Sequence, residues 1–148
     1  MGFRATGLAS LHKGNSPIGL GGIGGFVEVT AVPRELQLEL AGRLLFEEGH
    51  LQITIQLLFK KPWDIKGLRF FIGVGPAVVL GIPVGEAHEP ADESEGLKDV
   101  HFGFSGVAGL TWWMRPRVGL TGELNYNIVV DNGAGHELGA SVGVVFAL

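Results

Sequence analysis

The sequence predicts an all-β fold, an eight-stranded antiparallel up-and-down transmembrane β-barrel that forms a single domain over residues 1–148. Three observations lead to this prediction. The composition is rich in glycine and poor in charge, apolar and polar residues alternate over long segments, and the connections differ systematically between the two ends of the sheet. A chain of 148 residues has room for one hydrophobic unit and not for two.

The composition separates this chain from most soluble domains. It holds 25 glycines and only 18% charged residues, whereas an average soluble domain has about 25% charged residues. A membrane-spanning helix needs roughly 20 consecutive apolar residues. The longest uncharged run, residues 70–85, has 16 residues and includes four glycines and two prolines. Strands therefore explain the apolar composition better than helices do.

Charge and cysteine content exclude several classes of function. The net charge of −4 argues against nucleic-acid binding, which requires a basic stripe. The chain has no cysteine, so it has no disulfide framework, no thiolate metal site and no cysteine nucleophile.

Alternation with a period of two defines the strands. Between Leu51 and Phe59, every second residue is a large apolar one, and Gln52, Thr54 and Gln56 fall on the other face. Most of the segments are longer than the 5–6 residues that are about average in soluble proteins, and they suit a tilted membrane strand of about 9–11 residues. In chain order, the predicted strands are 3–12, 20–32, 35–46, 50–60, 67–81, 98–113, 117–130 and 137–148.

The third segment could instead be a helix, because residues 34–49 are rich in helix-forming residues, follow Pro33 and end at Gly49. At about 100° per residue, however, its leucines and Phe46 scatter around the whole helix and define no face. With a period of two, the acidic and amide residues of 35–40 oppose the leucines. We therefore predict a strand.

The connections are of two kinds. Those at 33–34 and 114–117 are tight, the one at 60–66 is somewhat longer, and all three contain proline and basic residues. Those at 13–18, 47–49, 84–97 and 131–136 hold most of the acidic residues, and 84–97 is long. Alternate connections of an up-and-down barrel lie at the same end. One end is therefore predicted to be short-turned and basic, and the other looped and acidic.

Three segments carry a resemblance to a known group: residues 70–83 (FFIGVGPAVVLGIP), 116–130 (PRVGLTGELNYNIVV) and 136–148 (HELGASVGVVFAL). The chain resembles the small eight-stranded outer-membrane barrels of Gram-negative bacteria, the OmpA/OmpX-like β-barrel group. The last segment is similar to the C-terminal assembly signal of such barrels, although its aromatic residue, Phe146, lies two positions before the end. The resemblance implies a place in the bacterial outer membrane, with the lipid bilayer and the outer-membrane assembly machinery as partners.

A soluble lipocalin-like barrel that binds an apolar ligand is the alternative architecture, because it shows the same alternation with its faces reversed. Side-chain size favours the membrane barrel. The more polar face also carries many small residues, and the apolar face carries most of the large ones, which suits a narrow lumen surrounded by lipid.

The lumen of the predicted barrel collects the charged and amide residues of the inner face. Buried charges must be paired and hydrogen-bonded, and eight strands enclose an interior that side chains just fill. We therefore expect a polar network that closes the lumen, with a small ion conduit as the alternative. The residues are Arg4, Glu28, Gln37, Glu39, Arg43, Gln52, Gln56, Arg69, Glu123, Asn125 and Asn127.

Aromatic residues gather toward the ends of the strands, which is typical of the two interfacial girdles of a membrane barrel. We predict one girdle at the basic end and one toward the looped end. The first comprises Phe59, Trp63, Trp112 and Phe146, and the second comprises Phe46 and Tyr126.

All five histidines map to the looped end, close to many carboxylates. Imidazole with carboxylate suits Zn²⁺, Cu²⁺ or Ni²⁺, although polar loops often contain histidine and no tight ligand motif is present. We treat this group as a speculative metal site and predict no resident cofactor. The residues are His12, His50, His88, His101 and His136.

Enzymatic activity is considered because some outer-membrane barrels of the resembled group deacylate or acylate lipid A. The deacylases carry His-x-Ser near the last strands, whereas His136 is followed by Glu137 and Leu138. His101 and Ser105 share a face but lie about 13 Å apart along a strand. We therefore predict a monomeric, non-enzymatic outer-membrane barrel with a structural or surface-interaction role and acidic loops facing outward. A lipid-modifying enzyme and the lipocalin-like barrel remain the alternatives.

Overall fold

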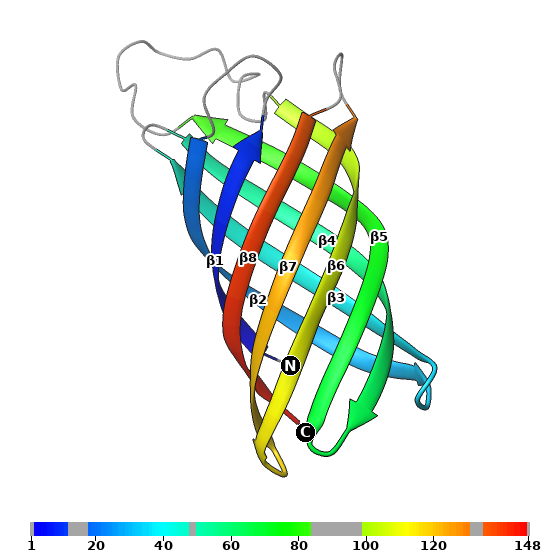
Figure 1. Ribbon diagram of the computed structural model, residues 1–148. Helices are drawn as coiled ribbons and strands as arrows, with labels where there is room; N and C mark the ends of the chain where they lie inside the picture. The colour runs from blue at the N-terminus through cyan, green and yellow to red at the C-terminus, as the bar shows by residue number, and fades with distance from the viewer. Residues whose placement is uncertain (1, 12–17, 48–49, 84–98, 131–134, 148) are drawn as a thin grey trace.

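The computed structural model describes residues 2–11, 18–47, 50–83, 99–130 and 135–147, and for 3–11, 18–20, 47, 50, 83 and 99 it describes the backbone alone. Eight antiparallel strands follow one another around the sheet, and β1 pairs with β8 as well as with β2, which closes the barrel (Figure 1). The strands are β1 Gly2–Leu11, β2 Ile18–Val32, β3 Leu36–Glu47, β4 His50–Ile65, β5 Leu68–Pro83, β6 Asp99–Arg115, β7 Val118–Val130 and β8 Gly135–Phe146.

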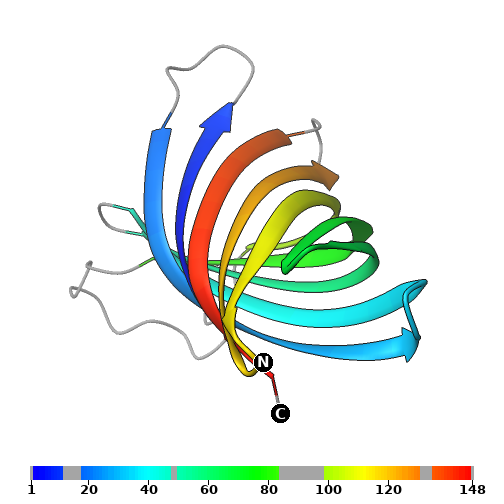
Figure 2. The ribbon, with the colours of Figure 1, turned by 60° about the horizontal axis from the view of Figure 1, so that its bottom comes forward.

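The predicted all-β, antiparallel up-and-down architecture is confirmed. The third segment is strand β3, because its polar and apolar residues alternate between the two faces of the sheet. No helix of the described residues is long and apolar enough to cross a membrane. The strands are tilted and coil around a common interior (Figure 2).

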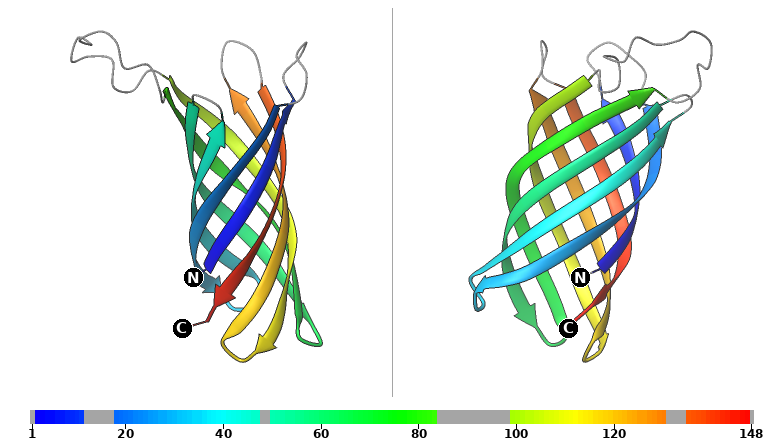
Figure 3. Two further views of the ribbon diagram at one scale, coloured as in Figure 1. Left: turned by 90° about the vertical axis from the view of Figure 1, so that its left-hand side faces the viewer. Right: turned by 180° about the vertical axis from the view of Figure 1, so that it is seen from behind.

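The short turns and both chain ends gather at one end of the barrel, which we call the turn end; the opposite end is the loop end (Figure 3). The β4–β5 connection is shorter than predicted. Residues 60–65 belong to β4, and only Lys66 and Gly67 separate it from β5. Both have positive φ, 47° and 86°, which matches the type of two-residue turn that follows the strand twist.

The prediction of a connection over 60–66 is therefore wrong, and the pairing partners explain why. Pro62 lies opposite Phe71 in the ladder, and Asp64 lies opposite Arg69, with which it forms an ion pair of 2.8 Å. In the sequence, lysine and proline indicate a turn. Here Lys60, Lys61 and Pro62 continue strand β4, because they pair in register with residues of β5.

Side chains alternate strictly between the interior and the outer surface. In β4, Thr54, Gln56 and Leu58 are at most 1% exposed, whereas Ile55 and Leu57 between them are 45% and 40% exposed. Strands β7 and β8 repeat the pattern, with polar residues inside and large apolar ones outside. The barrel therefore has a polar interior and an apolar outer face.

A small apolar core interrupts the polar interior. Leu58, Phe71 and Val107 pack together in it, and Phe26 is also buried. Beside this core the β4–β5 ladder has a gap, because the paired residues pass from Gln56–Ala77 directly to Phe59–Val74. A Cβ atom on Gly75 would overlap the Leu57 carbonyl across this gap.

We predict that Gly75→Ala destabilises the barrel by about 1–3 kcal/mol, because the added methyl group meets backbone that cannot move aside. The measurement is the free energy of unfolding in detergent micelles, from a urea titration followed by tryptophan fluorescence. The control is Gly122→Ala in β7, where a Cβ atom has nothing within 4 Å. Equal stability of the two variants would show that the close approach at Gly75 is not a constraint.

Candidate functional site

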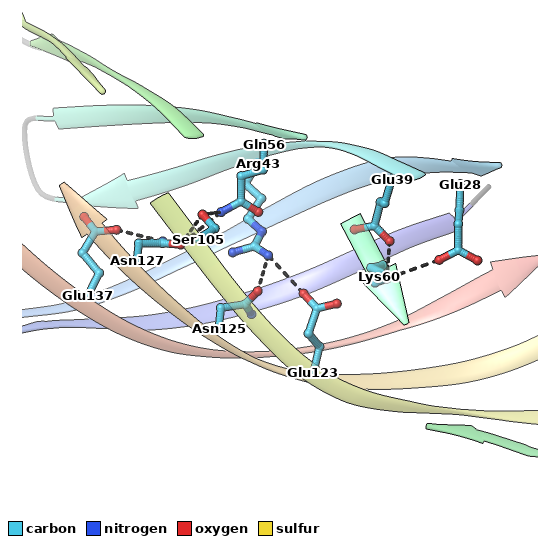
Figure 4. Close-up of polar contacts among 10 residues, drawn as sticks. All are labelled: Glu28, Glu39, Arg43, Gln56, Lys60, Ser105, Glu123, Asn125, Asn127 and Glu137. Carbon is cyan, nitrogen blue, oxygen red and sulfur yellow. Dashed lines mark hydrogen bonds and ion pairs between the residues drawn. The ribbon is translucent and has the colours of Figure 1, made fainter. Parts of the chain in front are cut away.

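The first polar cluster of the interior is built around Arg43 of β3. Its guanidinium Nη2 donates to Glu123 Oε1 at 3.1 Å and to Asn125 Oδ1. The side chains of Arg43 and Glu123 are 2% and 0% exposed. Both acceptors belong to β7, on the other side of the lumen (Figure 4). Arg43 therefore bridges two strands that are not neighbours in the sheet.

A chain of amide and hydroxyl groups extends from this cluster toward the loop end (Figure 4). Gln56 Nε2 donates to Ser105 Oγ at 2.8 Å and to Asn127 Oδ1 at 3.1 Å, and Ser105 Oγ donates to Asn127 Oδ1 at 2.7 Å. Asn127 Nδ2 then donates to Glu137 Oε2 at 3.1 Å, and Gln52 Nε2 donates to Glu137 Oε1 at 3.3 Å. The Glu137 carboxylate is thus held by amide donors from two sides.

The second cluster is built around Lys60 of β4, which is 1% exposed. Its Nζ donates to Glu39 Oε2 at 2.6 Å and to Glu28 Oε2 at 3.3 Å. The same atom lies 3.9 Å from the centroid of the Phe71 ring, a distance at which a desolvated cation is attracted by the aromatic face. Lys60 therefore joins strands β2, β3 and β5 to β4.

Most of the predicted lumen residues lie in these two clusters or in the amide chain, but Gln37, Arg69 and Arg4 do not; Gln37 is buried, at 4% exposure. Glu28 and Glu39 contact Lys60, and Arg43 contacts Glu123. Arg69 lies at the turn-end rim, where it pairs with Asp64 of β4 rather than with an interior carboxylate. For Arg4 the structure describes the backbone, which lies opposite Gly24 and Gly143.

Sequence reasoning missed Lys60, the most buried cation of the described residues. It was assigned to a connection because Lys60, Lys61 and Pro62 indicate a turn. The signal that could have found it is the period of two itself, since Lys60 continues the inward positions of Gln56 and Leu58. Ser105 and Glu137 also belong to the observed polar network, although they were not among the predicted lumen residues.

The predicted girdle residues all lie on the outer face. Their exposed fractions run from 39% for Phe146 to 55% for Phe46. The others are Phe59, Trp63, Trp112 and Tyr126. Trp63, Trp112 and Phe146 lie close to the turn end, and Phe46 and Tyr126 lie toward the loop end. Tyr126 is further held by His136, whose Nδ1 lies 2.9 Å from the phenolic oxygen.

The histidines are not gathered into a metal site in the part of the chain that the structure describes. There, no three His, Cys, Asp or Glu residues are placed to hold a metal ion. His136 stacks on Tyr126 with 5.9 Å between ring centroids, and His101 is partly buried in β6. The side chain of His50 and all of His12, His88 and the acidic connection 84–97 lie outside the described residues.

Comparison with known proteins identifies the fold. No family model matches the chain, and no curated protein matches it by sequence. Neisserial surface protein A has a TM-score of 0.77 and 11% identity, over 99% of this chain and 95% of that protein. The N-terminal β-barrel domain of Pseudomonas aeruginosa OprF has a TM-score of 0.63 and 15% identity, over 98% and 96%. The outer-membrane enzyme PagL has a TM-score of 0.59 and 10% identity, over 97% and 99%.

These neighbours are small outer-membrane β-barrels, so the resemblance inferred from the sequence is confirmed at the level of the fold. Identities of 10–15% carry no further conclusion about activity. One neighbour is an enzyme, so the fold alone does not distinguish catalytic from non-catalytic barrels.

We predict that Lys60→Met destabilises the barrel by about 3–5 kcal/mol, because it removes the cation that lies 2.6 Å from the buried Glu39 carboxylate. The double variant Lys60→Met/Glu39→Gln should recover at least half of that loss, since the fully buried carboxylate is then replaced by a neutral amide and the remaining partner, Glu28, is 22% exposed. Both values come from unfolding titrations in detergent.

The matched control is the adjacent Lys61→Met. Lys61 forms a 3.6 Å pair with Glu35 in which both side chains are substantially exposed. Such a pair contributes under about 1 kcal/mol. A loss at Lys61 as large as the loss at Lys60 would contradict the assignment of Lys60 to the interior.

Proposed function

We propose that this chain is a membrane-embedded β-barrel of the bacterial outer membrane with a structural or surface-interaction role. The observation that carries the proposal is the distribution of side chains. Ionised groups such as Lys60 and Arg43 are buried inside, while large apolar residues cover the outside. Such an outer face requires lipid as its solvent. A closed barrel suits lipid because it has no strand edge whose backbone groups lack hydrogen-bond partners.

The same distribution disfavours a soluble lipocalin-like barrel. A barrel that binds an apolar ligand has an apolar cavity, but here buried side chains and their ion pairs fill the interior. Soluble monomers rarely expose apolar patches larger than a few hundred Å². In this chain, exposed apolar residues occur on every strand from β2 to β8.

The filled interior supports a barrel that does not conduct. Beside Lys60 and Phe71 the cavity has a volume of about 20 Å³, which is room for about one water molecule. Toward the loop end, the chain from Gln56 to Glu137 crosses the lumen with hydrogen bonds. We infer that this network holds the barrel closed.

The described residues also support a non-enzymatic role. Ser105, the buried hydroxyl nearest the middle of the amide chain, is hydrogen-bonded to Gln56 and Asn127, neither of which can act as a general base. His136 contacts Tyr126 on the outer face. We infer a monomer that the outer-membrane assembly machinery inserts with its basic turn end inward and its acidic connections outward.

We predict that Ile55→Arg destabilises the bilayer-inserted barrel by about 2–4 kcal/mol, because Ile55 is 45% exposed near the middle of the apolar span of β4. The measurement is the free energy of unfolding in phospholipid vesicles. Ile65→Arg is the depth control, since Ile65 is also exposed, at 55%, but lies at the turn end. There the cost should fall to about 0–1 kcal/mol. A soluble barrel would tolerate both substitutions alike.

We predict no large, steady pore when the chain is reconstituted in planar bilayers, because the interior is filled by side chains. Porin-like openings of the nanosiemens class from a monomer would contradict the closed lumen while leaving the membrane assignment intact.

A further inference from the structure

The outer face carries a groove of about 560 Å³ over strand β6. Gly106 and Ala108 line its floor. In register with Gly106 lie Val74 of β5 and Tyr126 of β7, and both side chains stand exposed at 66% and 44%. Ile72 and Leu124 flank Ala108 in the same way. Two small residues between four large ones thus leave a trough in an otherwise raised apolar surface.

The two ends of the groove differ. Lys61 lines one end, opposite Ile72 in the β4–β5 ladder. Its side chain is partly exposed, and among the described residues it forms a 3.6 Å ion pair with Glu35, which is weak at such exposure. Tyr126 lines the other end, where His136 holds its ring in place. The groove therefore crosses the strands from β4 to β8 and is largely apolar. Lys61 is its outward-facing cation, at the β4 end, because the other lysine of the lining, Lys60, is buried.

The turn end, toward which Lys61 lies, carries further basic residues. The turns at this end expose Arg34, Lys66, Arg115 and Arg117, against Glu35 and Asp64 among the described residues. Lysine side chains at membrane interfaces extend their ammonium groups to the headgroups. A lipid with an anionic headgroup would thus meet a turn end with more exposed basic residues than acidic ones among the described residues.

We propose that this groove binds one anionic glycerophospholipid, with an acyl chain that crosses β6 over Gly106 and Ala108 and with its phosphate group at Lys61. The proposal rests on the proposed function, because it requires the outer face to lie in lipid. The one outward-facing cation of the lining matches a ligand with one charged end.

A second outer groove provides an internal comparison. It has a volume of about 440 Å³ over strands β2 to β4, and Val27, Leu40, Gly42 and Ile55 help to line it. Its lining, as far as the structure describes it, includes no charged residue. This groove can accept acyl chains but has no means of distinguishing one headgroup from another.

The test is native mass spectrometry of the full chain in detergent, titrated with phosphatidylglycerol and phosphatidylcholine that carry identical acyl chains. A single basic residue at a lipid surface gives about fivefold preference for an anionic headgroup. We expect that preference in the wild type. Lys61→Gln should bind both lipids equally, and Gly106→Leu should lose the preferentially bound phosphatidylglycerol.

The control is Gly42→Leu, which adds the same side chain to the second groove. A Cβ atom has nothing within 4 Å at Gly42, and at Gly106 it has only the Tyr126 carbonyl at 3.9 Å. Both variants should therefore fold, and Gly42→Leu should keep the fivefold preference. This control separates filling of the β6 groove from a general change of the apolar surface.

Three results would overturn the proposal: equal binding of the two lipids by the wild type, an unchanged preference in Lys61→Gln, or a dimer that Gly106→Leu abolishes. The last would assign the groove to a second copy of the chain. Failure of the proposed function looks different, because the wild type would then stay monomeric and folded without detergent. A chain that needs detergent yet shows no preference loses only the lipid site.

Discussion

The buried cations Lys60 and Arg43 constrain the rest of the barrel. Each needs carboxylate partners, because an unpaired charge in a closed interior costs several kcal/mol. Lys60 finds Glu39 and Glu28 on neighbouring strands, and Arg43 reaches across the lumen to Glu123. These contacts require the sheet to curl until β3 faces β7. Once the charged residues are inside, the period of two places their apolar neighbours outside.

The outer face follows from this interior and decides the surroundings of the molecule. Ile55 and Leu57 lie on either side of the buried Gln56 and cannot turn inward without exposing it to lipid. The outer band of β4 is interrupted by Lys61, beyond which Trp63 and Ile65 lie near the turn end. A cation followed by an aromatic residue is the order expected where hydrocarbon gives way to headgroups. The same Lys61 lines the end of the β6 groove, so the boundary of the bilayer and the proposed lipid site share one residue.

The local sequence pattern was sufficient to predict the strands, but it was not sufficient to predict which interior side chains contact one another. The alternation around Ile55 predicted β4 and its two faces, and the absence of a helical face excluded a helix at β3. The contact between Arg43 and Glu123 joins residues 80 positions apart, and such pairs depend on how the strands are staggered around the barrel, which alternation does not specify. Lys60 was missed because turn-forming residues follow it. Alternation places Arg69 on the inner face, where it lines the cavity beside Lys60, but alternation does not specify that its partner is Asp64 at the rim.

The most direct test of the account is the accessibility of successive β4 residues in lipid vesicles. The chain has no cysteine, so single cysteines at positions 53–59 can each carry one spin label without any other change. Collision with oxygen, which concentrates in the bilayer, should alternate, high at Ile53, Ile55, Leu57 and Phe59 and low at Thr54, Gln56 and Leu58. A water-soluble nickel chelate should reach neither set. Strong collisions of the chelate with the Ile55 and Leu57 positions would show that the apolar face lies in water and would contradict the account.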